Sequence, residues 1–277
     1  MANFECPNCF SKLVTTLNKV YVTKKKIETN LCHCKTCDYL FLPNPHWLDI
    51  AYETEFFGDS GYVLRNLNIF KKSIILFRCW KIISNNQVLP NGCDLGAGLG
   101  IYARLMRDHG YNFFGSDEYC SMPLIRPFVE INSNSSIKTA FEVVEHLPSL
   151  TNFLKEQIKE VDLFLFSTEL RDEGFIPEID WWYYVFPTGQ HIGFHSKKSL
   201  SYAFEIAGYD SKLLISYGSS LHALTNTRKW NIAFKMAKVI WRLNSVIEII
   251  SKKIVSMIYK EKSLTQDDYN YSMKKIK

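Results

Sequence analysis

A glycine-rich segment near the middle of the chain constrains the fold more than any other feature. It is a D-x-G-x-G-x-G pattern made of Asp94, Gly96, Gly98 and Gly100. A helix-like stretch follows at residues 101–109, then a short apolar strand at 111–115 and the acid Asp117. Glycines let a backbone pass close to a ligand, and a carboxylate after the second strand can bind two ribose hydroxyls. The segment therefore predicts an α/β domain that binds a nucleoside-type ligand.

Asp94 sets this segment apart from ordinary pyrophosphate-binding loops. A carboxylate before the glycines would repel a pyrophosphate, but it suits a cation such as the amino-acid end of S-adenosylmethionine. Further along, we expect residues 137–141 to form a strand. The segment E-V-V-E-H-L follows it directly, at 142–147. That hexapeptide is similar to the EVxEHL segment of many methyltransferases. Over roughly residues 90–225, the chain resembles the class I S-adenosylmethionine-dependent methyltransferases.

The resemblance implies an α/β fold, with a Rossmann-like seven-strand sheet and helices on both faces. It also implies that the cofactor is held by Asp94, Gly96, Gly98, Gly100, Asp117 and Glu142. We expect a strand at 161–166, a helix from the capping residue Ser196 to Ala207, and a closing hairpin, 213–217 with 221–224. The sequence offers no clear candidate for the third strand of this methyltransferase fold. The segment between Glu118 and the 137–141 strand is short and contains two prolines.

Two carboxylates and an imidazole stand together in the E-V-V-E-H-L segment. The spacing of Glu142, Glu145 and His146 can place all three on one side of the turn, which suits a divalent cation such as Mg²⁺ or Mn²⁺. This layout resembles the small-RNA 2′-O-methyltransferases, and the resemblance implies His191 as a fourth ligand. Two alternatives stay open. In one, His191 acts alone as a general base. In the other, Glu145 and His146 only orient loops and His191 is a structural hydrogen-bonding residue.

Cysteines are concentrated at the start of the chain. Two C-x-x-C knuckles, Cys6 with Cys9 and Cys34 with Cys37, flank a segment rich in Val, Thr, Tyr and Ile that we expect to form a hairpin. Four thiolates on two tight turns suit structural zinc, as in a zinc ribbon. Cys32 and His33 are rival ligands, and a metal-free cluster of reduced thiols is the alternative.

The sequence divides into four parts: a zinc-ribbon-like module at 1–45, a helical linker at 46–88, the methyltransferase-like domain at 89–225 and a basic helical tail at 226–277. The tail has 12 Lys and Arg against 4 Asp and Glu, while the rest of the chain is slightly acidic. Its apolar and basic residues alternate over 229–259. We expect this segment to pack on the domain or a second subunit, or to lie on an anionic membrane.

Several function classes are disfavoured. The longest apolar stretch is too short and charged to span a membrane, and the N-terminus lacks signal-peptide features, so we expect a cytoplasmic protein. Because the basic charge is confined to the tail, a broad nucleic-acid surface is not expected. A cysteine-rich N-terminus joined to this core resembles the sugar and surface-polysaccharide methyltransferases. The resemblance implies that this protein O-methylates a sugar or glycan acceptor. Alternatives are C-methylation of a nucleotide-linked ketosugar, RNA 2′-O-methylation and a non-catalytic binding module.

Overall fold

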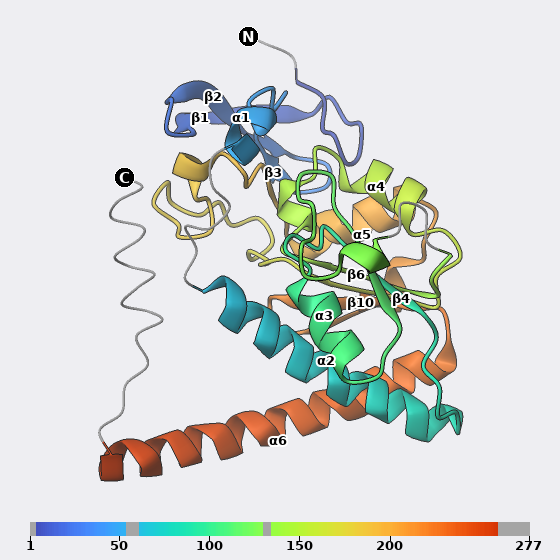
Figure 1. Cartoon of the computed structure of the whole chain (residues 1–277). Helices are drawn as coiled ribbons and strands as arrows, with labels where there is room; N and C mark the ends of the chain where they lie inside the picture. The colour runs from blue at the N-terminus through green and yellow to red at the C-terminus, as the bar shows by residue number, and fades with distance from the viewer. Residues whose placement is uncertain (1–3, 54–60, 130–133, 260–277) are drawn as a thin grey trace.

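The computed structural model describes residues 4–53, 61–129 and 134–259. Two β-sheets organise the chain, a larger central one and a smaller one above it in Figure 1. The central sheet has six strands. From one edge to the other they are β5 (Phe113–Ser116), β4 (Gly92–Leu95), β6 (Ile137–Phe141), β7 (Leu163–Ser167), β10 (Leu221–Leu224) and β9 (Leu214–Tyr217). The first four are parallel, whereas β10 runs antiparallel to both of its neighbours.

The expected strands and closing hairpin therefore form, but the described part of the chain holds six central strands and not seven. The seventh would be the third strand of the usual order, beside β5. Only an isolated parallel bridge between Gly115 and Val129 lies there. The short connection explains the difference. It begins with a loop and a 3-10 turn at Arg126–Phe128, so little extended chain remains before β6.

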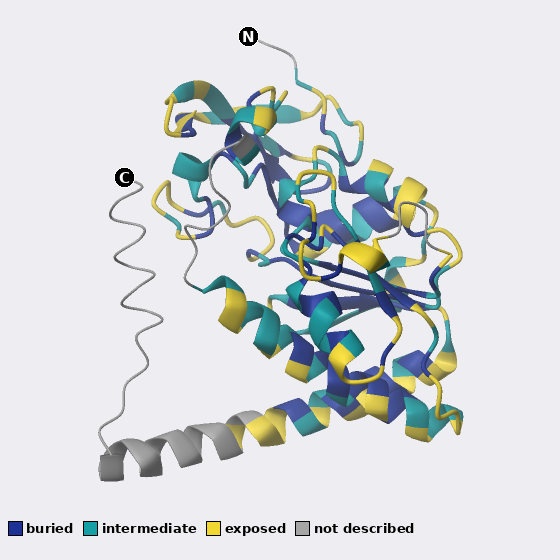
Figure 2. Cartoon of the chain, viewed as in Figure 1, coloured by how far each residue is buried: buried dark blue, intermediate teal, exposed yellow. Residues whose placement is uncertain are grey.

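Helices cover both faces of the central sheet, as expected. The side chains of β7 show how, because Leu163 and Leu165 belong to one core and Phe164 and Phe166 to the other. The first core includes residues of α2 (Tyr62–Ser84), α3 (Ile101–Asp108) and α6 (Arg228–Tyr259). The second includes residues of α4 (Leu150–Gln157) and α5 (Lys197–Ile206). The strands β4, β7 and β10 between them are buried at every residue (Figure 2), which is typical of a sheet with two covered faces.

Helix α5 illustrates how the sequence sets a boundary. Its N-cap is Ser196, whose hydroxyl accepts a hydrogen bond from the backbone N–H of Ser199, while the Ser199 hydroxyl accepts one from the N–H of Ser196. This reciprocal arrangement satisfies two N–H groups that a helix start would otherwise leave without partners. Gly208, just past the end, adopts a positive φ of 96°. The cap predicted from the sequence is therefore confirmed.

The small sheet joins segments that are far apart in sequence. Its order is β1 (Val14–Val22), β2 (Ile27–Cys34), β3 (Leu40–Phe41) and β8 (Gly193–Phe194). The first two strands are the expected hairpin, but β8 comes from the C-terminal third of the methyltransferase-like domain. A buried ion pair between Arg171 and Asp38 joins the same two parts, with 3.0 Å between Nη2 and Oδ1. The sheet therefore crosses the boundary that the sequence placed at residue 45.

The linker and the tail pack against each other. Within the linker the described residues form two helices, α1 (Leu48–Glu53) and the long α2. Trp230 and Trp241 of α6 are 1% and 3% exposed, and Trp230 stacks on Trp80 of α2 with 5.0 Å between ring centroids. These tryptophans belong to the core and are not available to a membrane. The polar end of the tail, 260–277, lies outside the described residues. Among the helices that the structure describes, none combines the length and apolarity needed to cross a bilayer.

Candidate active site

The glycine loop connects β4 to α3 and has the backbone geometry that its sequence requires. Gly96 and Gly100 have φ of 66° and 81°, in the left-handed region that disfavours other residues. A Cβ at Gly96 would lie 2.5 Å from Cγ2 of Val143, and one at Gly100 would lie 2.5 Å from Cγ1 of Ile125. These glycines are therefore required both by the turn and by close packing beneath it.

Asp94, at the end of β4, is almost fully buried. Its carboxylate accepts a hydrogen bond of 2.6 Å from the Thr139 hydroxyl on β6. Burial raises the pKa of Asp94 to about 7, the Thr139 hydrogen bond opposes the shift, and the charge of Asp117 adds to it. A cation bound beside Asp94 would favour the ionised form, since an opposite charge stabilises a carboxylate.

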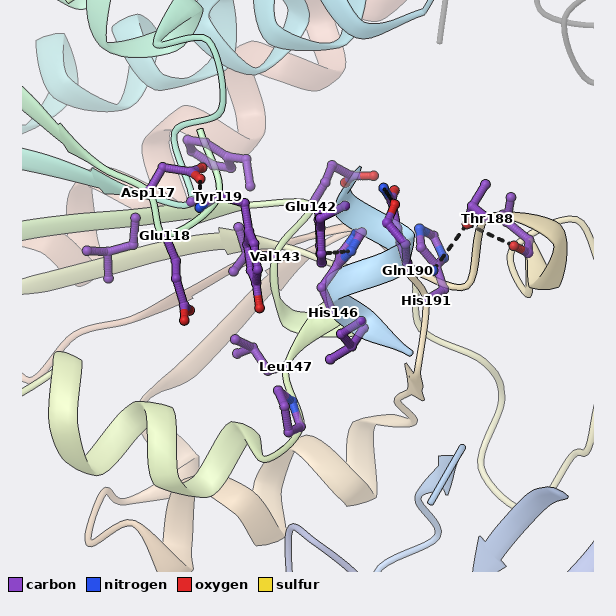
Figure 3. Close-up of a pocket in the computed structure, with 18 of the residues that line it drawn as sticks. Asp117, Glu118, Tyr119, Glu142, Val143, His146, Leu147, Thr188, Gln190 and His191 are labelled. Atoms are coloured by element: carbon purple, nitrogen blue, oxygen red, sulfur yellow. Dashed lines mark hydrogen bonds between the residues drawn. The ribbon is translucent and has the colours of Figure 1, made fainter. Parts of the chain in front are cut away.

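Asp117 follows β5 and holds the glycine loop in place. Its carboxylate accepts hydrogen bonds from the N–H groups of Gly98 at 2.7 Å, Tyr119 at 2.9 Å and Cys120 at 2.7 Å. The neighbouring Glu118 lies on the cavity wall, and in Figure 3 its side chain extends away from Asp117. Two carboxylates therefore lie at the position where the sequence predicts a ribose-binding acid, and one of them is engaged by the loop.

One cavity of about 1280 Å³ contains both sets of residues that the sequence singled out. Asp94, Gly96 and Asp117 line one part of it, and Glu142, His146 and His191 line another. Ligand pockets usually have volumes of about 300–1,000 Å³. The cavity is therefore large enough for two ligands side by side.

His191 has one defined tautomer. Its Nδ1 lies 2.7 Å from the backbone carbonyl oxygen of Tyr183. Because a carbonyl only accepts, Nδ1 carries the proton, and Nε2 of the neutral ring keeps a lone pair. Burial lowers the pKa of His191 to about 4, although the Tyr183 hydrogen bond opposes that shift. At neutral pH this imidazole is an uncharged proton acceptor.

Two further ligand-type groups lie beside His191. The rings of His146 and His191 have centroids 4.9 Å apart, and Nδ1 of His146 lies 2.9 Å from the Tyr52 hydroxyl. Glu145 completes the cluster, in which the three candidate ligand atoms lie within 4.8 Å of one another. Both Glu145 oxygens are buried without a well-formed hydrogen bond among the described residues. Burial raises the pKa of Glu145 to about 8, the Glu142 charge adds to this effect, and the nearby hydroxyls of Tyr183 and Thr168 act to lower the pKa.

Buried carboxylate oxygens without a well-formed hydrogen bond, beside two imidazoles, form a donor set that suits a divalent cation. Glu142 does not belong to this cluster. It adopts a positive φ of 56°, its carboxylate accepts a 2.7 Å hydrogen bond from the Ser167 hydroxyl, and it lies 3.9 Å from Nε of Arg65. The structure thus brings together three of the four residues that the E-x-x-E-H resemblance implies.

Comparison with known proteins identifies the family. A family model described as a methyltransferase domain matches residues 63–212, which is more than half of the chain. The chain belongs to this methyltransferase family. No curated protein sequence matches the chain.

Solved structures that resemble this chain include CalO1, a methyltransferase in calicheamicin biosynthesis, at 11% identity and a TM-score of 0.39. They also include human N-acetylserotonin methyltransferase, at 13% identity and a TM-score of 0.40. The alignments cover 57% and 58% of this chain and 55% and 56% of those proteins. The chain therefore spans only about half the length of these relatives.

The N-terminal cysteines of the methyltransferase converge as the sequence predicts. The sulfurs of Cys6 and Cys37 lie 3.6 Å apart and those of Cys9 and Cys34 lie 3.4 Å apart. All four lie within 4.8 Å of one another, and none is in a disulfide. Tetrahedral zinc with Zn–S bonds of about 2.3 Å implies sulfur–sulfur distances of about 3.8 Å. The four thiols therefore fit one zinc ion.

The rival ligands lie outside this cluster. Cys32 is buried elsewhere in the small sheet, and Nε2 of His33 is 2.8 Å from a carboxylate oxygen of Asp38. His33 thus supports the second knuckle through Asp38, which follows Cys37 directly.

One residue of the cavity wall, Tyr52, was not foreseen from the sequence. Tyr52 of α1 contacts His146 and stacks on Tyr119, with ring centroids 4.1 Å apart. The Tyr183 hydroxyl accepts a hydrogen bond of 2.9 Å from the N–H of Glu169, and it lies 3.1 Å from the Thr168 hydroxyl. Tyr52 and His146 are 94 residues apart in sequence, so no local pattern connects them.

Proposed function

We propose that this methyltransferase transfers a methyl group from S-adenosylmethionine to a hydroxyl oxygen of a sugar or glycan-type acceptor. The observation that carries the proposal is the shared cavity. It is lined at one place by the glycine loop and its acids, and at another by an uncharged histidine with a lone pair on Nε2. Methyl transfer needs this combination, because the acceptor proton must leave while donor and acceptor are held in line.

The cofactor end would be formed by residues of β4, the glycine loop and the end of β5. Asp94 would face the cationic amino-acid portion, and Gly96, Gly98 and Gly100 would allow close approach of the backbone. Asp117 or Glu118 would accept the ribose hydroxyls. Acidic groups at this end match the positive charge that S-adenosylmethionine carries.

Two mechanisms for removing the acceptor proton are supported by specific contacts. In the first, Nε2 of His191 takes the proton directly, and the Tyr183 carbonyl keeps the ring oriented. In the second, Glu145, His146 and His191 would hold a divalent cation, supported by the two Glu145 oxygens, which lack a well-formed hydrogen bond among the described residues. Such a cation supplies Lewis acidity that lowers the pKa of a hydroxyl.

Binding and turnover test the proposal separately. Calorimetry with S-adenosylmethionine should give one site per chain. Transfer of a radiolabelled methyl group to a panel of free sugars, sugar phosphates and oligosaccharides should then identify an acceptor, with labelled product stable to mild base, as expected of an ether. No heat of binding would support a non-catalytic module, and labelling at carbon would support C-methylation.

We also infer that α6 lies on an anionic membrane surface. Five of its apolar side chains, 37–58% exposed, follow an alternating spacing of four and three residues: Ile232, Met236, Val239, Leu243 and Val246. They lie opposite the face that buries Trp230 and Trp241. Exposed Lys235 and Arg242 flank this stripe, and residues 228–247 contain no acid. Apolar stripes with basic flanks favour anionic interfaces.

Vesicle sedimentation tests this contact. The protein should bind vesicles that contain phosphatidylglycerol more strongly than pure phosphatidylcholine, and Val239→Gln with Leu243→Gln should abolish binding. Substitution of Lys12 by Gln, on an exposed part of the N-terminal module, is the control. If the variant instead turns a dimer into a monomer in light scattering, and vesicle binding is absent, the stripe is a subunit interface.

A further inference from the structure

The large cavity is lined by charged residues of both signs, among them Arg65, Glu142 and Glu156. Acidic residues Asp94, Asp117 and Glu118 line the part next to the glycine loop. Two lysines, Lys24 and Lys25, line the cavity from a different element, the turn between β1 and β2. The two lysines therefore add positive charge to a part of the wall that the glycine loop does not form, and this charge suits an anionic ligand there.

The turn that carries the lysines is held in place. Thr23 is 6% exposed, and its N–H donates a 3.0 Å hydrogen bond to the carbonyl oxygen of Phe186. The turn closes through a 3.1 Å hydrogen bond from the N–H of Lys26 to the carbonyl oxygen of Thr23. Both of these residues have positive φ, at 63° and 53°. The backbone beneath the lysines is therefore fixed, although their side chains are exposed.

The hydrogen bond between Thr23 and Phe186 places the turn beside the loop that carries His191. A Cβ at Gly189 would lie 2.6 Å from Cγ2 of Thr23, and the Gly189 carbonyl accepts a 2.9 Å hydrogen bond from the Trp47 indole. Thr188, Gln190 and His191, which flank Gly189, line the cavity together with the lysines. The basic turn and the candidate base are thus parts of one packed unit.

The charges of these lysines are not neutralised within the described part of the chain. Neither Lys24 nor Lys25 forms an ion pair with a described residue, and both are exposed. On the same hairpin, by contrast, Lys19 pairs with Glu28 at 2.8 Å. Two adjacent ammonium groups without acidic partners, at the wall of a cavity, favour a ligand with concentrated negative charge.

We propose that the acceptor carries a phosphate or diphosphate group that Lys24 and Lys25 bind, while its hydroxyl lies at His191. The inference rests on the proposed methyl transfer and specifies the acceptor as a phosphate-linked sugar. The small N-terminal module then has a second role besides metal binding, because its hairpin turn selects the substrate. A neutral sugar would leave both ammonium groups without a partner and would bind more weakly.

Calorimetry with inorganic pyrophosphate as the probe tests the lysine site directly, with the protein saturated with S-adenosylhomocysteine. We expect binding that weakens at least tenfold in Lys24→Ala with Lys25→Ala and weakens as salt is raised. The matched control is Lys12→Ala with Lys19→Ala, which removes the same charge from the same module outside the cavity and should change affinity less than twofold. Equal loss in both variants, or no binding by the unmodified protein, would overturn the proposal.

A competition arm distinguishes phosphate from carboxylate. Glucose 1-phosphate should displace pyrophosphate, whereas glucuronate at the same concentration should not, and equal displacement by both would overturn the phosphate assignment. Affinity for S-adenosylmethionine is measured in parallel. A protein that binds S-adenosylmethionine but not pyrophosphate rejects the lysine site alone, whereas a protein that does not bind S-adenosylmethionine rejects the proposed function.

Discussion

The chain contains two clusters of metal-ligand side chains that differ in how they are built. The cysteine cluster comes from two tight turns, one before β1 and one after β2, and its sulfurs lie close together. The Glu145–His146–His191 cluster joins a turn after β6 to a loop 45 residues later, and its two histidines line the large cavity. Closed four-ligand sites stabilise folds, whereas catalytic sites keep a position open for a substrate. We therefore expect the cysteine cluster to determine the stability of the protein and the Glu145–His146–His191 cluster to determine its activity.

The largest effect should come from breaking the cysteine cluster. Protein with intact knuckles should contain about one zinc per chain, and Cys37→Ser should lose it. Because structural zinc supplies on the order of 10 kcal/mol to small modules, we expect a lower melting temperature by calorimetry and a disrupted small sheet. Affinity for S-adenosylmethionine should change little. Cys32→Ala, outside the cluster, should keep its zinc, and an unchanged melting temperature in metal-free protein would contradict the zinc assignment.

Replacing His191 should lower activity and leave stability nearly unchanged, which is the reverse of the effect expected for Cys37→Ser. His191→Ala should lower the methyl-transfer rate by about 10²–10⁴-fold, with zinc content and melting temperature nearly unchanged. Full activity of this variant would exclude both proposed mechanisms and direct attention to Tyr183 and Glu169.

The pH dependence separates the two mechanisms at this second cluster. A lone His191 base must be neutral, and its pKa of about 4 means that activity falls only as the pH drops toward 4. The ordinary histidine value would have placed that fall near pH 6.5. A cation site behaves differently, because Glu145 with a pKa of about 8 must lose its proton to bind metal. At limiting Mg²⁺, activity should then rise between pH 6 and 8, and chelator should abolish it reversibly.

A smaller effect is expected at the cofactor end of the cavity. Asp117→Ala removes the acceptor of three backbone hydrogen bonds, including that from Gly98. It should weaken S-adenosylmethionine binding by ~1.5–3 kcal/mol in calorimetry. Glu118→Ala is the comparison. If only Glu118→Ala weakens binding, that neighbour is the ribose-binding acid.

The last expected effect is a dependence of cofactor affinity on pH. Because burial raises the pKa of Asp94 to about 7, the free protein holds it mostly protonated below that pH. A cationic ligand prefers the carboxylate, so affinity should increase from pH 5 to 7, by at most about tenfold per pH unit. Asp94→Asn should flatten the slope. A flat profile in the unmodified protein would show that Asp94 does not face the cation.

Local sequence patterns were enough to predict much of the fold. The glycine loop, the strands on each side of it, the capped helix α5 and the β9–β10 hairpin follow from turn residues and apolar periodicity, which act within a few positions of one another. That the described residues hold no seventh central strand was already suggested by the short segment after Glu118. The tail was harder, because its tryptophans suit a membrane surface or a helix interface equally well, and only the packing of Trp230 on Trp80 distinguishes these environments.

The sequence by itself determined which chemical groups this protein has and the spacing that makes them useful: two cysteine knuckles, a glycine loop between acids, and an E-x-x-E-H segment. Tertiary structure decided which of them meet. It brought His191 to Glu145 and His146, kept Glu142 apart beside Ser167, and joined strand β8 to the N-terminal sheet. The physical reason is that burial and hydrogen bonding between distant segments depend on the packed core, and local spacing does not encode them.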